Sequence, residues 1–419
     1  MKRFAASLIS ALIAHVAIAQ SLPKGNPSEL GFSPEKLDAI STTLKTDIGK
    51  NMIPGAVILV MRHGKVAMFE ADGVRDPGTK EAMTTDTIFR IYSMSKAITT
   101  TAAMMLVEQG KLSLTDPVSK YIPSFAHMKV IVPKPDPNGG KPTTELVDAK
   151  NQITIADLMR HTSGITYGFF GQSAQKSAYN DGGVMAGDPT NEEFAERIAK
   201  LPLGTEPGTT WDYSHSTDVL GRVVEVVSKK SLYEFEKDNL LKPLGMSDTS
   251  FYVNDKAKQP RIAEPFPNDR TIGVGATFGD PRVTGKWESG GGGMMSTATD
   301  YTVFLQMMLH NGKAGGKQYL KESTVADMTS DHTQGIKRTA LYLPGAAYGF
   351  GWGFAVRTGD DMPNNRGTVG DYTWNGVGGT HFWVDPKKDM TVVFMIQSVR
   401  QRPRYMALIR NMVYDAIVQ

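Results

Sequence analysis

A serine followed three positions later by a lysine can support covalent catalysis. The lysine amine can take the proton from the hydroxyl as the hydroxyl attacks a substrate. The 419-residue chain contains this Ser-x-x-Lys pattern four times, at Ser21/Lys24, Ser33/Lys36, Ser93/Lys96 and Ser173/Lys176. The spacing alone is therefore weak evidence, and the surrounding sequence has to distinguish the four pairs.

Only Ser93 stands between a strand-like segment and an apolar helix. Residues 88–92 (Ile-Phe-Arg-Ile-Tyr) are typical of a strand, and residues 94–109 are apolar nearly all round, which predicts a buried helix. The first two pairs lie in a polar lead-in, and the fourth lies in a loop-like stretch. Residues i and i+3 share one face of a helix, so Lys96 is expected to reach the Ser93 hydroxyl.

The start of a buried helix is also a suitable electrostatic environment for this pair. A lysine acts as a base only when its ammonium form is disfavoured, and burial and the positive end of a helix both act in that direction. The backbone N–H of Ser93 would point outward at this helix start and could stabilise an oxyanion. Ser93 is therefore the predicted nucleophile and Lys96 its predicted base.

Both ends of the chain contain strand patterns. Residues 56–62 and 65–71 flank His63-Gly64, which predicts a hairpin. Further strands are expected at 348–357, 381–384 and 390–397, and residues 405–418 have one apolar helical face. We expect an α/β (α+β) fold in which helices flank an antiparallel sheet built from both termini.

The middle of the chain has helical rather than strand patterns. Thr190 and Glu193 form a capping-box pattern for a helix through Lys200, and residues 218–227 are amphipathic. Residues 129–151 form a long polar excursion. We expect an α/β domain from residues 20–110 and 285–419, a mainly helical insertion at 111–284, and an active site in the cleft between them.

Residues 1–19 resemble a secretory signal peptide. Lys2 and Arg3 precede a short apolar run that ends in Ala17-Ile18-Ala19, a small-x-small cleavage pattern. This predicts a secreted protein, most simply periplasmic. No later stretch has the ~20 apolar residues of a membrane span.

Composition excludes several classes of partner and chemistry. Removing the leader removes two positive charges and lowers the formal net charge from +3 to +1, so binding to nucleic acid has little support. The chain has no cysteine, which excludes disulfides, thiolate metal sites and a cysteine nucleophile. No cofactor is expected.

Several separated motifs resemble the serine β-lactamase and penicillin-recognising superfamily, particularly its class C branch and the family VIII carboxylesterases. The similarity covers nearly all of the mature chain, and four segments carry it: 90–96 (Arg-Ile-Tyr-Ser-Met-Ser-Lys), 158–164 (Leu-Met-Arg-His-Thr-Ser-Gly), 290–297 and 379–386. The family's second motif is a tyrosine on a loop of the helical domain, and the resemblance assigns it to Tyr213. Its hydroxyl would share the proton taken from Ser93 and return it to the leaving group.

The class C pattern continues with asparagine two positions later, where this chain has His215. That histidine could donate to a substrate carbonyl or merely fill space.

The third motif, normally Lys-Thr-Gly, resembles the Trp-Gly-Gly version of family VIII and here consists of Trp374, Asn375 and Gly376. The resemblance places the second oxyanion N–H at Val377. A lysine would favour a substrate carboxylate, whereas Trp374 offers an apolar wall suited to neutral groups. His381, on the next predicted strand, could line the site, although a structural role is favoured.

Other catalytic patterns are weaker or missing. The chain has no Gly-x-Ser-x-Gly, and none of its eight histidines has helical metal-ligand spacing, so no metal site is predicted. His161 is expected to order the turn at Thr162-Ser163-Gly164. Residues 290–293, four glycines, lack the lysine of a phosphate loop and predict a tight backbone crossing.

These observations favour an esterase that cleaves small neutral esters through an acyl-enzyme on Ser93. The alternatives are a β-lactamase or D-Ala-D-Ala-type peptidase, and a non-catalytic binding protein on the same fold. The sequence does not reveal the physiological ester or the oligomeric state.

Overall fold

The computed structural model describes residues 22–140, 143–272, 276–277, 279–339, 342–360, 362 and 364–418, so the predicted leader at 1–19 lies outside the described residues. Its centre is an eight-stranded sheet in the order β14-β15-β16-β17-β18-β1-β2-β3, in which every neighbouring pair is antiparallel. The strands are β1 (Gly55–Arg62), β2 (Lys65–Asp76), β3 (Glu81–Ala82), β14 (Tyr348–Phe350), β15 (Ala355–Arg357), β16 (Tyr372–Asn375), β17 (His381–Asp385) and β18 (Met390–Met395). This confirms the predicted sheet built from both ends of the chain.

The turns of this sheet follow from a few backbone positions. His63 and Gly64 both have positive φ, 52° and 68°, as a tight turn between β1 and β2 requires. The strand predicted at 348–357 is instead a hairpin of two short strands. Gly353, at φ 85°, turns the chain there, and the sequence pattern did not reveal that break.

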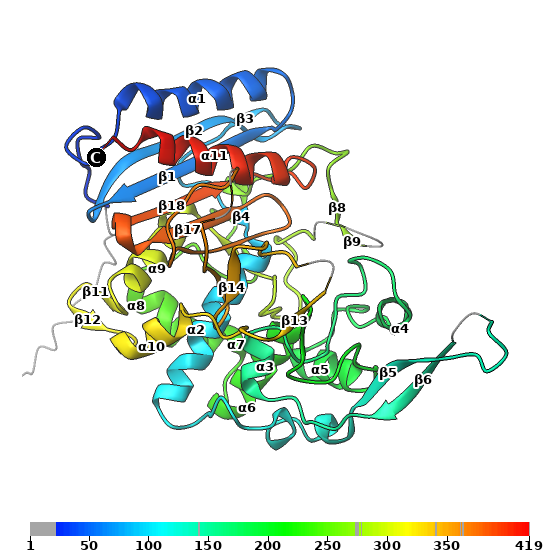
Figure 1. Cartoon of the computed structure of the whole chain (residues 1–419). Coiled ribbons are helices and arrows are strands. Elements are labelled where there is room, and N and C mark those ends of the chain that lie inside the picture. Colours follow the sequence, from blue (N-terminus) through cyan, green and yellow to red (C-terminus); the bar gives the residue numbers. More distant parts are fainter. Residues whose placement is uncertain are drawn as a thin grey trace, which may run out of the picture.

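Helices cover both faces of the sheet (Figure 1). α1 (Pro34–Gly49) and α11 (Arg402–Ala416) share one apolar core with Trp383, Val392 and Phe394. α2 (Ser95–Glu108) and α9 (Ala298–Leu309) share a second core with Phe382 and Val393. The alternation of neighbouring strand residues between the two cores is the period-2 pattern of a sheet buried on both sides.

The segment between the two halves of the sheet is mainly helical, as predicted. It contains α3 (Ile155–Met159), α4 (Ala174–Asp181), α5 (Asn191–Ala199), α6 (Ser216–Ser228), α7 (Leu232–Glu236) and α8 (Lys242–Leu244). The capping box at Thr190 and Glu193 is confirmed. The polar excursion contains a hairpin, β5 (Lys129–Lys134) with β6 (Thr143–Asp148), which projects from the body in Figure 1. The exact domain boundaries stay a prediction.

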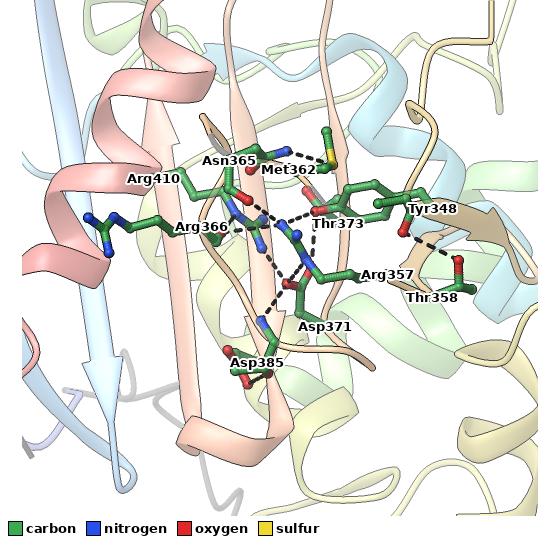
Figure 2. Close-up of polar contacts among 12 residues, drawn as sticks. Tyr348, Arg357, Thr358, Met362, Asn365, Arg366, Asp371, Thr373, Asp385 and Arg410 are labelled. Atoms are coloured by element: carbon green, nitrogen blue, oxygen red, sulfur yellow. Dashed lines mark hydrogen bonds and ion pairs between the residues drawn. The ribbon is translucent and has the colours of Figure 1, made fainter. Parts of the chain in front are cut away.

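A buried ionic cluster joins α11 to the strand that carries the third motif (Figure 2). Asp371, which directly precedes β16, accepts from Arg357 Nε at 2.7 Å and from Arg410 Nη2 at 2.5 Å, and all three side chains are almost completely buried. Through these two ion pairs, Asp371 connects the start of β16 to Arg357 on β15 and to Arg410 on α11. These ion pairs therefore help to hold β16 in position against β15 and α11.

In the described part of the chain, no helix is both long enough and apolar enough to cross a membrane.

Candidate active site

Ser93 lies in a short 3₁₀ turn, η1 (Tyr92–Met94), that leads directly into α2. The predicted strand before it is shorter than expected, because β4 covers only Phe89–Arg90 and Tyr92 has a left-handed φ of 44°. The Ser95 hydroxyl donates to the Tyr92 carbonyl at 2.6 Å and accepts from the Met294 N–H at 3.1 Å. These two bonds hold the turn, which leaves Ser93 half-buried at the start of the helix.

Lys96 is completely buried, and its side-chain nitrogen contacts Ser93. Nζ lies 3.4 Å from Ser93 Oγ, and it also donates to the Tyr167 hydroxyl at 2.9 Å and the Gly291 carbonyl at 2.6 Å. Within the described residues, no carboxylate forms an ion pair with it. The helix spacing thus brings the amine to the serine as expected, and a tyrosine and a backbone carbonyl complete its surroundings.

Tyr213 lies beside Lys96, but its hydroxyl has another partner. The centre of its ring is 4.7 Å from Lys96 Nζ, and its hydroxyl accepts from the Trp374 indole N–H at 3.2 Å. No hydrogen bond joins the Tyr213 hydroxyl to Lys96 or Ser93. Trp374 is buried against this ring, with 5.3 Å between ring centres.

Tyr167 is the residue that the sequence did not single out. It follows the 158–164 motif by three positions, which is the only signal that could have found it. Burial raises the pKa of its hydroxyl well above the ordinary value, and the nearby Asp218 charge acts in the same direction. The hydroxyl is therefore neutral and can both accept from Lys96 and donate a proton.

His215 and Asp218 form a buried pair behind Tyr167. The Nδ1 atom of His215 lies 2.9 Å from Asp218 Oδ2, and the His215 ring centre is 4.2 Å from that of Tyr167. Burial lowers the pKa of His215, although Asp218 opposes this. Burial alone would raise the pKa of Asp218, but the hydrogen bond and charge of His215, with lesser help from Lys96 and Ser289, hold it below the ordinary value.

Asp218 also fixes the glycine segment that faces Lys96. Its Oδ1 accepts from the Gly291 N–H at 3.0 Å and from the Ser289 hydroxyl at 2.5 Å. A side chain on Gly291 would place its Cβ 2.6 Å from Asp218 Oδ2, and one on Gly290 would lie 2.9 Å from the Thr217 carbonyl. The predicted tight crossing at residues 290–293 is confirmed, and it presents the Gly291 carbonyl to Lys96.

The loop between β16 and β17 packs closely on the nucleophile turn. A Cβ on Gly376 would lie 2.4 Å from the Ile91 carbonyl, and one on Gly378 would lie 2.9 Å from the Tyr92 ring. Val377 stands between these glycines, and its N–H makes no hydrogen bond to any described residue. Val377 and Ser93 line the same cavity, and the role of this N–H as an oxyanion donor stays a prediction.

Ser93, Val377, Tyr167 and His215 line one cavity of about 340 Å³. Its walls are largely aromatic and apolar, and they include Phe169, Phe170, Met185, Phe251, Tyr252, Ile272 and Trp287. An apolar wall of this kind binds uncharged organic groups. In the part of the chain that the structure describes, no cluster of three or more histidines and acids could hold a metal ion.

Of the five predicted substrate-binding residues, only His215 lines this cavity, whereas Trp374, Asn375, Gly376 and His381 do not. Asn375 and His381 are paired across β16 and β17. Asn375 accepts from Arg402 Nη1 at 3.1 Å, and the His381 ring packs on Trp383 and Phe394 in the core under α11. Burial lowers the pKa of His381 to about 3, although the Gly379 backbone opposes this. His161 lies behind Tyr213 and shares a 3.1 Å hydrogen bond with Ser214.

The sequence of this chain matches a known protein family over most of its length. The family model described as Beta-lactamase matches residues 40–413. This chain belongs to the beta-lactamase family.

Three relatives within the beta-lactamase fold are informative. Esterase EstB of Burkholderia gladioli is 30% identical over 390 residues, covering 86% of this chain and 91% of EstB. Lovastatin esterase of Penicillium rubens is 29% identical over 387 residues, covering 86% and 92%. The structure of EstCE1, a hydrolase with promiscuous acyltransferase activity, superposes with a TM-score of 0.75 at 28% identity, covering 90% of this chain and 98% of EstCE1. The chain is accordingly a serine hydrolase of this family.

Proposed function

We propose that the protein is a carboxylesterase that cleaves small neutral esters through an acyl-enzyme on Ser93. The observation that carries this proposal is the 3.4 Å approach of Lys96 Nζ to Ser93 Oγ at the wall of an apolar cavity. The relatives named as esterases support the same reaction class.

In the proposed reaction, Ser93 Oγ attacks the ester carbonyl carbon and its proton passes to Lys96 Nζ. The N–H groups of Ser93 and Val377 stabilise the negative oxygen of the tetrahedral intermediate. Lys96 then returns the proton to the departing alcohol, directly or through the hydroxyl of Tyr167 or Tyr213, and the C–O bond of the ester breaks. Water repeats the sequence on the acyl-enzyme, releasing the acid and restoring the Ser93 hydroxyl.

The preference for small neutral substrates rests on the cavity and on Trp374. Ligand pockets span roughly 300–1,000 Å³, so the volume of about 340 Å³ suits a short acyl or alcohol group. Trp374 stands where the family's third motif has a lysine, and its indole donates to Tyr213 rather than offering a cation to a substrate carboxylate. Direct contact between Trp374 and the substrate stays a prediction.

The test is hydrolysis of p-nitrophenyl acetate and butyrate by the purified protein and by Ser93→Ala. We expect turnover by the natural protein and its loss in the variant. Ser173→Ala is the matched control, because Ser173 also belongs to a Ser-x-x-Lys pair but caps α4 at the surface. An active Ser93→Ala variant would overturn the proposed nucleophile.

Two further assays address the alternative functions. Nitrocefin turnover as efficient as ester turnover would favour a β-lactamase or peptidase over an esterase. Failure of a fluorophosphonate probe to label Ser93 would favour a non-catalytic binding protein on this fold.

We also propose that residues 1–19 direct export to the periplasm. Fractionation of cells expressing the full chain and a variant without residues 1–19 tests this. Equal cytoplasmic retention of both proteins would contradict it.

A further inference from the structure

Glu236, the last residue of α7, is a completely buried carboxyl group that the proposed reaction does not use. Its Oε1 lies 2.9 Å from the Thr99 hydroxyl, and its Oε2 has no hydrogen-bond partner among the described residues. The titratable groups around it are Glu225 on α6, Glu288 before the glycine segment and Tyr233 on its own helix, and none is a cation. A charged carboxylate here would be both desolvated and repelled.

The Thr99 hydroxyl has two acceptors and only one proton. Its oxygen lies 2.9 Å from Glu236 Oε1 and 3.1 Å from the Gly290 carbonyl. If Glu236 is ionised, its carboxylate and the Gly290 carbonyl can both only accept, and the single Thr99 proton can serve only one of them. If Glu236 carries a proton on Oε1, it donates to Thr99 and Thr99 donates to Gly290, so these three oxygen atoms all have a partner.

The hydrogen bonds of Glu236 and Thr99 end at the Gly290 carbonyl, one residue before the carbonyl that accepts from Lys96. Thr99 is three positions after Lys96 on α2, and the carbonyls of Gly290 and Gly291 accept from Thr99 and Lys96 respectively. The Gly291 N–H is held by Asp218 on the other side. The backbone of this segment is therefore fixed by Asp218 at one point and by Thr99 at the other.

We propose that Thr99 is a positioning residue for Lys96, and that Glu236 acts in its neutral form to direct the Thr99 proton to the Gly290 carbonyl. This proposal rests on the proposed role of Lys96 as the base for Ser93. Burial raises the pKa of Glu236 well above the ordinary value, Glu288 and Glu225 raise it further, and the Thr99 hydrogen bond opposes them. When Glu236 loses its proton, Thr99 turns to the carboxylate and Gly290 loses its donor.

The first test removes the Thr99 hydroxyl at constant size. Thr99→Val should lower kcat for p-nitrophenyl acetate by about tenfold with KM little changed, since one hydrogen bond to a buried carbonyl is lost. Thr99→Ser keeps the hydroxyl and should restore most of the rate. The matched control is Thr100→Val, because Thr100 is equally buried on α2 and its hydroxyl has no partner in the described part of the chain. Equal rates for Thr99→Val and Thr100→Val would overturn the positioning role.

The second test concerns the proton on Glu236. Glu236→Gln cannot ionise and keeps a donor toward Thr99, so kcat should persist to higher pH than in the natural protein. Infrared difference spectra of the natural protein minus Glu236→Gln should show the carbonyl band of a protonated carboxylic acid at neutral pH. If kcat declined at the same alkaline pH in the natural protein and in Glu236→Gln, or if the infrared band were missing, the proposal that Glu236 is neutral would be wrong. The infrared result does not depend on ester turnover, so it separates this proposal from failure of the proposed function.

Discussion

The Tyr167 hydroxyl lies 2.9 Å from Lys96 Nζ, and this contact joins two residues 71 positions apart in the chain. It brings a neutral phenol to the amine that contacts Ser93. The hydroxyl of Tyr213, the tyrosine that the motif comparison indicated, is bound instead to the Trp374 indole. Two tyrosines therefore stand around one lysine, with different polar partners.

Tyr167→Phe should lower kcat for p-nitrophenyl esters by about tenfold or more, because it removes the hydroxyl in direct contact with Lys96. Tyr213→Phe, assayed in parallel, should also lower the rate through the loss of its bond to Trp374. Steady-state kinetics on both variants measure the two effects. Tyr372→Phe is the control, since the Tyr372 hydroxyl is buried without a partner in the described residues. A Tyr167→Phe enzyme with unchanged kcat would remove Tyr167 from the proton path.

Asp218→Asn should lower the free energy of unfolding by about 2–4 kcal/mol. The carboxylate accepts from His215, Ser289 and the Gly291 N–H. In asparagine an NH₂ group replaces one of the two accepting oxygens, so at least one of these donors loses its acceptor. Urea unfolding measures the change, with Asp238→Asn as the surface control because Asp238 is half-exposed in its pair with Lys230. Similar losses in both variants would contradict the role of Asp218 as the acceptor at this crossing.

Asp300, in the first turn of α9, makes stability depend on pH. Burial raises its pKa to about 6, while bonds from the Asp248 N–H and the Thr249 hydroxyl oppose the shift. Its pKa in the folded chain is above the ordinary value of 3.8, so its stabilising contribution is complete below about pH 4 and is lost as pH rises through about 6. The unfolding free energy of the natural protein minus that of Asp300→Asn should fall by up to about 3 kcal/mol across this window. Chemical denaturation at a series of pH values measures this, and parallel curves would contradict it.

Asp371→Asn should destabilise the fold by about 3–5 kcal/mol, because it leaves Arg357 and Arg410 buried without their carboxylate. Arg366→Ala is the comparison, since its guanidinium is mostly exposed in a surface pair with Asp415 and should contribute less than about 1 kcal/mol. Thermal and urea unfolding distinguish the two variants. A stable Asp371→Asn protein would mean that the cluster in Figure 2 does not hold β16.

The sequence predicted those features whose signal is local. The pair Ser93 and Lys96 follows from helix spacing, the β1–β2 hairpin from its turn, and the sheet from alternating apolar patterns. Tyr167, Asp218 and the Gly291 carbonyl meet Lys96 only because α2, α6 and two loops pack together. Contacts between segments so far apart leave no periodic trace in one sequence. Asn375 and Trp374 illustrate the same limit, because neighbouring residues on β16 point to opposite faces, and the motif alone does not tell which face adjoins Ser93.

The close packing of Gly376 and Gly378 on the nucleophile turn has a consequence for biosynthesis. The Thr380 hydroxyl and the Ile91 carbonyl that meet there are 289 positions apart. A chain emerging from the ribosome therefore displays Ser93 and Lys96 long before the loop with the Val377 N–H has been translated. Contacts of such long range form late in folding. The nascent protein should therefore acquire the proposed activity only after its last strands have joined the sheet.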